Sequence, residues 1–338
     1  MKALQKTAEL RRYRDKALNT GYLFFYSKAL ATAARLGVFD YIGTGSKSLK
    51  GLAAAMGTSE HGLELLLDAM VGMGHLSKKG NNYSNTRYGR EVFLKGKDLY
   101  IGDILRFHAT MWEGWNNLEQ SVRTGKSARL HNMFQDDKEE TRTFIMAMHN
   151  TAMGHAERLA SLIDLSGDKT LLDIGGGPAT YSIFFCKANP RLRATVLDLP
   201  GTLEVTKDVV SRFKMSRRIT LQEGDYNKDL PKGFDAAFLS HIIHSEGGEA
   251  NIGLMKRIYD ALNPGGKIII QDFILKSDKT QPSFASAFAL CMLLFTEKGR
   301  TYSFEEIKGW LEAAGFKSVK WLRRALPRDI SIVTAFRS

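Results

Sequence analysis

Hydrophobic and polar positions follow a helical spacing through the first 105 residues of the chain. Residues 21–36 are apolar almost all round, which predicts a helix that is buried in its own domain or against a partner chain. Residues 49–56 and 60–73 suit two shorter helices joined by a tight turn, and two short strands are expected around residues 78–82. A helix, a turn, a second helix and a two-stranded wing form the winged-helix pattern.

The pattern changes in the following residues. A helical region, with one long helix expected from about 139 to 165, leads into short β-rich runs that alternate with helical segments. The runs read TLLDI, RATVLDL, ITLQEGD, FDAAFLS and GKIIIQDFI. Such alternation predicts a parallel sheet covered by helices on both faces. We therefore expect a helical domain over residues 1–105 and an α/β domain over 106–338, whose helices in 106–165 link the two domains and line a pocket.

Composition limits the classes of protein that need to be considered. The chain has 338 residues, of which 43% are hydrophobic and 25% charged, as in an ordinary globular protein. Two cysteines exclude a disulfide scaffold and a four-cysteine zinc site. The N-terminal segment lacks the apolar core of a signal peptide, and no apolar run is long enough to cross a bilayer. We expect a cytoplasmic protein without a membrane partner.

A formal net charge of +12 raises the question of a nucleic-acid partner. The helix that would read DNA in a winged-helix regulator carries an acidic stripe, Glu60, Glu64 and Asp68, and contains no lysine or arginine. Such a face repels phosphates. The wing adds only Lys78 and Lys79. A DNA-binding regulator is therefore a remote alternative, and we expect no nucleic-acid partner.

A glycine-rich turn follows the first strand of the predicted α/β domain. The segment LLDIGGGPA places an apolar strand before three glycines, and a helix is expected to begin near Pro178. Glycines let a ligand approach the backbone closely. The dinucleotide fingerprint fails because Thr180 stands at its sixth position, and the Lys-Ser/Thr of a P-loop is missing. The three glycines of this turn are Gly175, Gly176 and Gly177.

Three carboxylates accompany the ends of successive strands. Asp173 precedes the glycines, Asp198 ends the second strand and Asp225 follows the third. These acids suit a ligand that has a cationic centre and ribose hydroxyls, which describes S-adenosylmethionine. A glycine turn alone is equally consistent with simple turn chemistry, but three acids in register with five strands favour the cofactor.

Two histidines follow the fourth strand, at the edge where open α/β sheets bind ligands. Methyl transfer to a phenol needs a base that removes the phenol proton, and an imidazole has a suitable pKa near ~6.5. The residues alone do not choose between His241 and His244, and each is more often structural than catalytic.

Taken together, these segments resemble the two-domain small-molecule O-methyltransferases typified by plant caffeate and acetylserotonin enzymes, with bacterial relatives. The resemblance rests on LLDIGGGPA, on VLDLP at 196–200, on EGDYNKDLP at 223–231, on the long segment 240–275 and on the winged-helix segment, and it covers nearly the whole chain. It implies a Rossmann-like methyltransferase sheet, mostly parallel, with seven strands and an antiparallel C-terminal strand. It also implies that the preceding winged-helix domain dimerises the protein into a homodimer.

The resemblance also implies roles for individual residues. His244 matches the catalytic base of the family, and Asp272 stands where plant enzymes have a glutamate that orients this base. The chain departs from the plant pattern at Ser240, which replaces a lysine, and at Gly299, which replaces a second glutamate for which Glu297 is a substitute. The implied cofactor-binding residues are Asp173, Gly175, Gly176, Gly177, Asp198, Leu199, Asp225, Tyr226 and Ser240.

The expected reaction is methyl transfer from S-adenosylmethionine to a hydroxyl of a hydrophobic, aromatic small molecule, without a metal. A cofactor-binding protein with non-methylating or C- or N-methylating chemistry is the alternative. Methionine adapts to flat aromatic ligands, although it is more often plain core. The residues expected to line the substrate pocket are His149, Met153, Met292 and Phe295.

Overall fold

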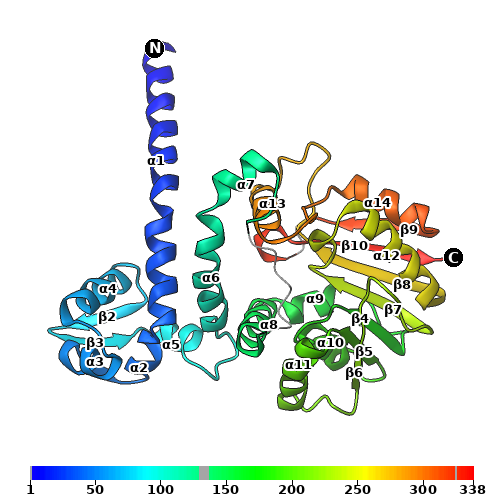
Figure 1. The fold of residues 1–338 in the computed structure, drawn as a ribbon, viewed down its shortest axis with the longest axis horizontal. Helices are drawn as coiled ribbons and strands as arrows, with labels where there is room; N and C mark the ends of the chain where they lie inside the picture. The colour runs from blue at the N-terminus through cyan, green and yellow to red at the C-terminus, as the bar shows by residue number, and fades with distance from the viewer. Residues whose placement is uncertain (1, 129–136, 324–325) are drawn as a thin grey trace. The chain divides into compact units, whose positions relative to one another are not determined.

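The computed structural model describes residues 2–128, 137–323 and 326–338, and for residues 2–5 only the backbone. The chain divides into two compact units, residues 1–110 and 111–338 (Figure 1). No helix in the described ranges combines the length and the apolar character that a bilayer span requires.

The first unit contains the elements of a winged helix. Its three short strands pair antiparallel in the order β1-β3-β2, and the helices α3 and α4 begin where the sequence predicts. Ser48 and Ser59 cap these helices by accepting hydrogen bonds from the backbone N–H groups of Gly51 and Gly62. The elements are α1 (Lys2–Arg35), α2 (Val38–Ile42), β1 (Ser46–Ser48), α3 (Leu49–Met56), α4 (Glu60–Gly72), β2 (Leu76–Lys79), β3 (Asn82–Asn85) and α5 (Arg87–Phe93).

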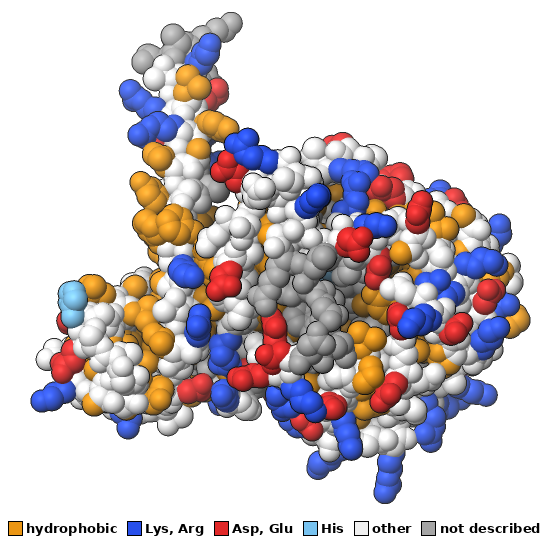
Figure 2. Space-filling view, in the orientation of Figure 1, with side chains coloured by type: hydrophobic (Ala, Val, Ile, Leu, Met, Phe, Trp, Pro, Cys, Tyr) orange, Lys and Arg blue, Asp and Glu red, His pale blue; other side chains and the backbone are white. Residues whose placement is uncertain are grey.

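The apolar segment near the N-terminus forms the second half of the long helix α1. Its last turns are buried in the core of the first unit, where Ala33 and Ala34 pack. Two to three turns earlier, five large side chains are between 51% and 60% exposed, and Figure 2 shows hydrophobic side chains gathered on this helix. These side chains are Tyr22, Leu23, Phe24, Phe25 and Tyr26, which we call the α1 aromatic patch. The sequence predicted that this segment is buried either in its own domain or against a partner chain. The exposure of the patch shows that it is not buried in its own domain.

Lys78, in the wing, forms ion pairs within the first unit. Lys78 Nζ lies 2.8 Å from Asp68 Oδ1 and 3.6 Å from Glu64 Oε1, so the wing pairs with the acidic stripe of α4. Asp68 also accepts a hydrogen bond of 2.7 Å from Tyr83. One of the two lysines that a DNA duplex would need is therefore already bound to carboxylates.

The second unit is built on a seven-stranded sheet with strand order β6-β5-β4-β7-β8-β10-β9. The first five strands in this order are parallel, whereas β10, the last strand of the chain, runs antiparallel to both of its neighbours. This is the sheet that the resemblance implied. The strands are β4 (Thr170–Ile174), β5 (Arg193–Asp198), β6 (Ile219–Glu223), β7 (Phe234–Ser240), β8 (Leu262–Asp272), β9 (Phe316–Leu322) and β10 (Ser331–Arg337).

Helices cover both faces of this sheet, as the alternating pattern predicts. Neighbouring strand residues point to opposite faces, so that Leu171 joins one hydrophobic cluster and Leu172 the other. The first cluster includes α9, α10 and α11, and the second includes α12 and α14 (Figure 1). The remaining helices are α6 (Gly102–Trp115), α7 (Leu118–Thr124), α8 (Lys138–Met153), α9 (Ala156–Leu162), α10 (Thr180–Ala188), α11 (Pro200–Arg212), η1 (Ile243–Ser245), α12 (Gly248–Ala261), α13 (Ser283–Phe295), α14 (Phe304–Ala313) and η2 (Pro327–Asp329).

Two helix boundaries differ from the sequence predictions. The single helix expected over 139–165 is two helices, α8 and α9, because the chain breaks at Gly154 and His155. The helix expected to begin near Pro178 begins at Thr180, since Ala179 is in the left-handed region with φ 59° and cannot belong to the helix.

Candidate functional site

The carboxyl ends of four adjacent parallel strands bring the predicted site residues to one edge of the large sheet. Strand β5 ends at Asp198, β7 at Ser240 and β8 at Asp272, while β4 runs into the glycine turn. The order β5-β4-β7-β8 therefore places the glycine turn between Asp198 on one side and the histidines on the other. Open α/β sheets bind their ligands at this edge.

The glycine turn has one crowded side and one open side. Gly175 and Gly177 have φ values of 62° and 52°, which a glycine adopts at little cost. A Cβ on Gly175 would collide with Ile242, and one on Gly176 would lie 2.7 Å from the Asp173 carboxyl carbon. A Cβ on Gly177 would meet no atom within 4 Å, so the space beside this residue is open.

Asp198 holds the glycine turn in place. Its Oδ2 accepts a hydrogen bond of 2.8 Å from the Gly177 N–H, and its Oδ1 accepts one of 2.8 Å from the Leu199 N–H. Burial raises the pKa of this carboxyl group, and the two backbone bonds oppose that effect. A carboxylate has about four acceptor positions, so the two bonds leave acceptor capacity for ligand hydroxyls.

Asp173 lies behind the glycine turn. Its side chain is buried, and its Oδ2 accepts a hydrogen bond of 2.6 Å from Ser182 on α10. Burial raises the pKa of Asp173 to about 7, although the Ser182 hydrogen bond works against it. A positive charge nearby would favour the ionised form of this carboxyl group.

Tyr226 forms a wall beside the turn. Its ring lies 3.6 Å from the position of a Cβ on Gly175, and its hydroxyl donates a hydrogen bond of 2.9 Å to Glu246 Oε1. Burial, followed by the charge of Glu246, raises the pKa of Tyr226 well above its usual value. The neighbouring Asp225 accepts a hydrogen bond from the Asn227 N–H at 2.9 Å. Sequence reasoning missed Glu246, because nothing in the spacing of residues shows a contact between separate loops.

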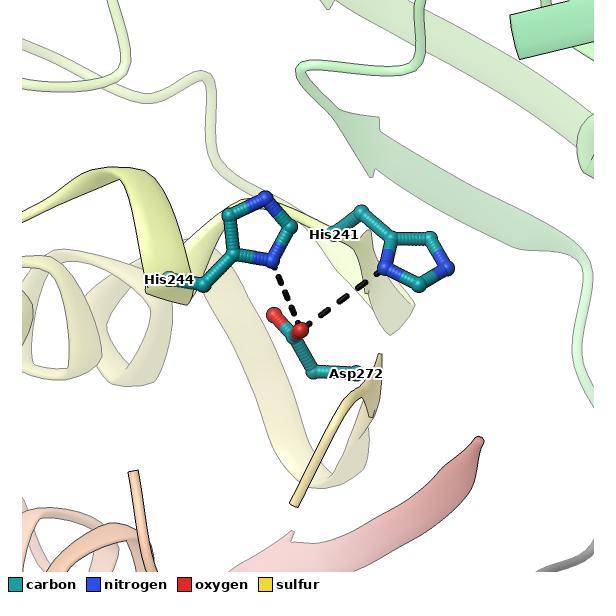
Figure 3. A group of neighbouring side chains, drawn as sticks. All are labelled: His241, His244 and Asp272. Atoms are coloured by element: carbon teal, nitrogen blue, oxygen red, sulfur yellow. Dashed lines mark hydrogen bonds and ion pairs between the residues drawn. The ribbon is translucent and has the colours of Figure 1, made fainter. Parts of the chain in front are cut away.

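His244 and Asp272 form a buried hydrogen-bonded pair (Figure 3). His244 Nδ1 lies 2.7 Å from Asp272 Oδ1, and the same oxygen accepts the Phe273 N–H at 2.7 Å. Burial alone would raise the pKa of Asp272, but His244 and His241 outweigh it and hold the pKa well below the usual range. The carboxylate therefore stays ionised, and it accepts the proton that His244 carries on Nδ1.

His241 is the third member of this group. Its Nδ1 lies 3.7 Å from Asp272 Oδ1, and ligand atoms of His241, His244 and Asp272 all lie within 4.8 Å of one another. Histidine and aspartate are residue types that bind zinc and other divalent metals. An ion bound to these atoms would have to displace the short hydrogen bond between His244 and Asp272.

A second carboxylate does not contact His244 within the described ranges. A Cβ on Gly299 would lie 2.5 Å from the His244 carbonyl oxygen and 2.9 Å from that of Ser245, so this position has no room for a side chain. Glu297 is exposed and lines a cavity of about 700 Å³ with Glu246 and Lys298.

Aromatic rings surround the histidine pair. The Phe288 ring meets the His244 ring edge-on with centroids 4.9 Å apart, and the Phe273 ring lies 4.7 Å from that of His241. Phe284 lies 5.1 Å from Phe273. The sequence predictions named none of these three phenylalanines as site residues, although Phe284 and Phe288 are one turn apart on the helix that carries the predicted Met292 and Phe295.

The predicted substrate residues on α13 lie further along the helix than Phe288. Met292 and Phe295 belong to a buried cluster against which Met111, Trp115 and Phe288 pack. Phe284, Phe288, Met292 and Phe295 share roughly one face of α13. Phe295 lies seven residues beyond Phe288, which is about 10 Å along a helix that rises 1.5 Å per residue.

His149 has protein partners on both ring nitrogens. Its Nδ1 lies 2.7 Å from Thr180 Oγ1, and its Nε2 lies 2.6 Å from an Arg212 nitrogen. Burial, helped by Arg212, lowers the pKa of His149 to about 4. This imidazole therefore ties α8 to α10 and α11, and it has no free nitrogen for a substrate. Met153, at the end of α8, is partly exposed.

Comparisons with known proteins agree with this architecture. Residues 109–317 match the O-methyltransferase domain family, and residues 19–95 match the O-methyltransferase dimerisation domain family. The 3-hydroxy-5-methyl-1-naphthoate 3-O-methyltransferase of Streptomyces sahachiroi is 28% identical over 92% of this chain and 92% of its own length. The acetylserotonin O-methyltransferase of Gallus gallus is 29% identical over 88% of this chain and 90% of its own length.

A solved structure shows the same fold. Human N-acetylserotonin methyltransferase, in complex with S-adenosylmethionine, superposes with a TM-score of 0.86 over 96% of this chain and 98% of that chain, at 24% identity. The match to the O-methyltransferase domain spans more than half of the chain, and the dimerisation domain precedes it. The chain belongs to the family of O-methyltransferases that combine these two domains.

Proposed function

We propose that this protein transfers a methyl group from S-adenosylmethionine to a hydroxyl of a hydrophobic, aromatic small molecule, and that His244 is the general base. The observation that carries the proposal is the His244–Asp272 hydrogen bond of 2.7 Å at the sheet edge that also presents the glycine turn. Membership of the O-methyltransferase family supports the reaction type.

The residues at the glycine turn fit the cofactor. The open space beside Gly177 admits a ligand, and Asp198 keeps acceptor capacity for ribose hydroxyls. We assign cofactor binding to the whole predicted set, with Asp173 acting from behind the turn through its charge. When bound, S-adenosylmethionine supplies an electrophilic methyl group.

His244 is held in the tautomer that a base requires. Because its Nδ1–H donates to Asp272, its Nε2 carries the lone pair that accepts the hydroxyl proton of the substrate. The ionised Asp272 then stabilises the imidazolium that forms. A positioned base of this kind contributes about 10²- to 10⁴-fold to the rate.

The rings around His244 indicate the kind of substrate. Phe273 and Phe288 lie against the histidine pair, and Phe284 is 41% exposed beside them. Flat apolar molecules stack on such rings. The named relatives act on a hydroxynaphthoate and on acetylserotonin. We therefore favour an aromatic substrate over a sugar or an aliphatic alcohol.

The protein is further proposed to act as a homodimer through the first unit. The match to the dimerisation domain and the exposed α1 aromatic patch support this assembly. The pairing of Lys78 with Asp68 and Glu64 supports the view that the winged-helix elements serve this assembly and do not read DNA.

The direct test of the reaction is methyl transfer. The purified protein is incubated with methyl-labelled S-adenosylmethionine and an extract of the host cells, and the labelled product is identified. We expect a methyl ether of an aromatic hydroxyl, with full activity in excess EDTA. Tight cofactor binding without a labelled product would instead support the non-methylating alternative, and label on carbon or nitrogen would support the C- or N-methylating one.

The role of His244 is tested by substitution. We expect His244→Ala to lower kcat at least ~10²-fold, because the proton acceptor is lost, while the Kd for S-adenosylmethionine, measured by calorimetry, stays unchanged. His61→Ala, at an exposed histidine of α4, is the control and keeps full activity. Unchanged turnover of the His244→Ala protein would remove His244 from the mechanism.

A further inference from the structure

His241 has an unusual backbone for its position. It follows the last residue of β7, where its N–H donates a hydrogen bond of 2.9 Å to the Gln271 carbonyl and extends the pairing of β7 with β8. Its φ is 58°, in the left-handed region that residues other than glycine and asparagine rarely adopt. Disfavoured backbone of this kind is often retained where a side chain must be aimed at a site.

The side chain of His241 points toward the carboxylate that orients the proposed base (Figure 3). Asp272 Oδ1 lies 3.7 Å from His241 Nδ1 and 2.7 Å from His244 Nδ1, and the two imidazole centroids are 5.7 Å apart. Asp272 Oδ2 is buried without a hydrogen-bond partner in the described ranges. The orientation of the carboxylate therefore depends on the groups around Oδ1.

The other ring nitrogen of His241 faces a buried polar chain. Gln271 Nε2 lies 3.4 Å from His241 Nε2 and donates a hydrogen bond of 2.9 Å to the Tyr181 hydroxyl, which lies 2.9 Å from His155 Nε2. When this nitrogen accepts from the Gln271 amide N–H, the ring is the tautomer that carries its proton on the other nitrogen. The proton is then on Nδ1, directed at Asp272.

Burial keeps His241 neutral. It lowers the pKa of His241, and although Asp272 raises that pKa, His244 and Arg328 lower it again. Tyr181 on α10 and His155, which precedes α9, also face this region, and burial raises the pKa of Tyr181 to about 12 and lowers that of His155 to about 4. Both are neutral near pH 7.

We propose that His241 is a positioning residue that shares Asp272 with His244. Its neutral Nδ1–H, 3.7 Å from Oδ1, directs the positive end of a dipole at this oxygen, which helps to keep the carboxylate in position and reduces the attraction of Asp272 for the proton of a protonated His244. This inference rests on the proposed function. It also explains how one carboxylate orients the base although Gly299 leaves no room for a second one. With part of the carboxylate charge taken up by His241, His244 loses its proton more readily and the base is active at lower pH.

The test is the pH dependence of kcat/KM in two variants of the full-length enzyme. His241→Leu removes the donor, whereas His241→Asn keeps an N–H near the place of Nδ1 and suits the left-handed backbone. We expect the acid limb of kcat/KM to move to higher pH by roughly half a unit or more in His241→Leu, and to stay at the wild-type position in His241→Asn. The Kd for S-adenosylmethionine stays unchanged in both.

Other outcomes would overturn the inference. A fall in kcat of His241→Leu with an unmoved acid limb would show a structural role only, and an equal shift in both variants would exclude the donor. A loss of more than ~10²-fold in both variants would make His241 itself the base. His241→Phe, which keeps a ring, replaces the leucine variant if that protein does not fold. Wild-type turnover is measured first, so that failure of the proposed function is seen there and failure of this inference only in the variants.

Discussion

Asp198 has a double role at the scale of single residues. It accepts the backbone N–H groups of Gly177 and Leu199, and it keeps acceptor capacity for a ligand. A substitution therefore removes both a proposed ribose contact and the support of the turn that surrounds the cofactor.

We expect Asp198→Ala to weaken S-adenosylmethionine binding by about 1–3 kcal/mol, because charge-assisted hydrogen bonds are lost. Isothermal titration calorimetry measures this change. The matched control is Asp208→Ala, which breaks an exposed ion pair with Arg142 on the neighbouring helices α11 and α8 and leaves the affinity as it was. Wild-type affinity in the Asp198 variant would exclude this carboxylate from the cofactor site.

The sequence predicts which residues reach the site edge but not how they contact one another. Strand ends place Asp198, His244 and Asp272 at this edge, because parallel strands share one carboxyl side. The approach of His241 to Asp272 depends on a left-handed residue and a side-chain rotamer. Neither the backbone conformation nor the rotamer can be predicted from the spacing of residues in the sequence. The same applies to the bond between Tyr226 and Glu246, which joins two loops.

At the scale of elements, α13 is a helix whose hydrophobic periodicity does not show which positions face a substrate. Its 13 residues contain no charged side chain, so no polar face tells which positions contact a substrate. Phe288 lies against His244 and also packs against the buried cluster that contains Met292, one turn further along.

The contact of Phe288 with the His244 ring predicts different kinetic effects for two substitutions on the same helix. Phe288→Ala should raise the KM for the aromatic substrate roughly tenfold, through lost ring contact. Met292→Ala should lower the free energy of unfolding by about 2–5 kcal/mol, because it leaves a cavity in the core, without changing KM. Steady-state kinetics and urea unfolding separate the two, and a KM effect confined to Met292→Ala would reverse our assignment.

Strands were predicted more accurately than helix boundaries. The five β-rich runs overlap β4 to β8, and central strands such as β4 and β7, which are mostly buried, read as nearly continuous apolar runs. The break between α8 and α9 was not predicted, since a lone glycine such as Gly154 is tolerated inside many helices. Only the backbone shows that His155 starts a new helix.

At the scale of the whole molecule, the α1 aromatic patch is a feature whose exposure to solvent the contacts within one chain do not explain. Five neighbouring large side chains are more than half exposed, in the range that matches the dimerisation domain. Exposed apolar patches of this kind mark sites of protein association.

We expect the double substitution of Phe24 and Phe25 by aspartate to convert the dimer into a monomer, because burying two carboxylates in an apolar interface is costly. Analytical ultracentrifugation measures the change in mass. Tyr88→Asp, at an aromatic residue of α5 that is 78% exposed, is the control and remains dimeric. A wild-type monomer, or a double variant that stays dimeric, would contradict the proposed assembly.

The close passage of Gly299 against the His244 carbonyl limits the evolutionary routes open to this enzyme. A glycine codon can become a glutamate codon by one nucleotide change, yet the backbone of His244 and Ser245 occupies the space that the new side chain would need. A second carboxylate can therefore be gained only after the chain before α14 has moved away.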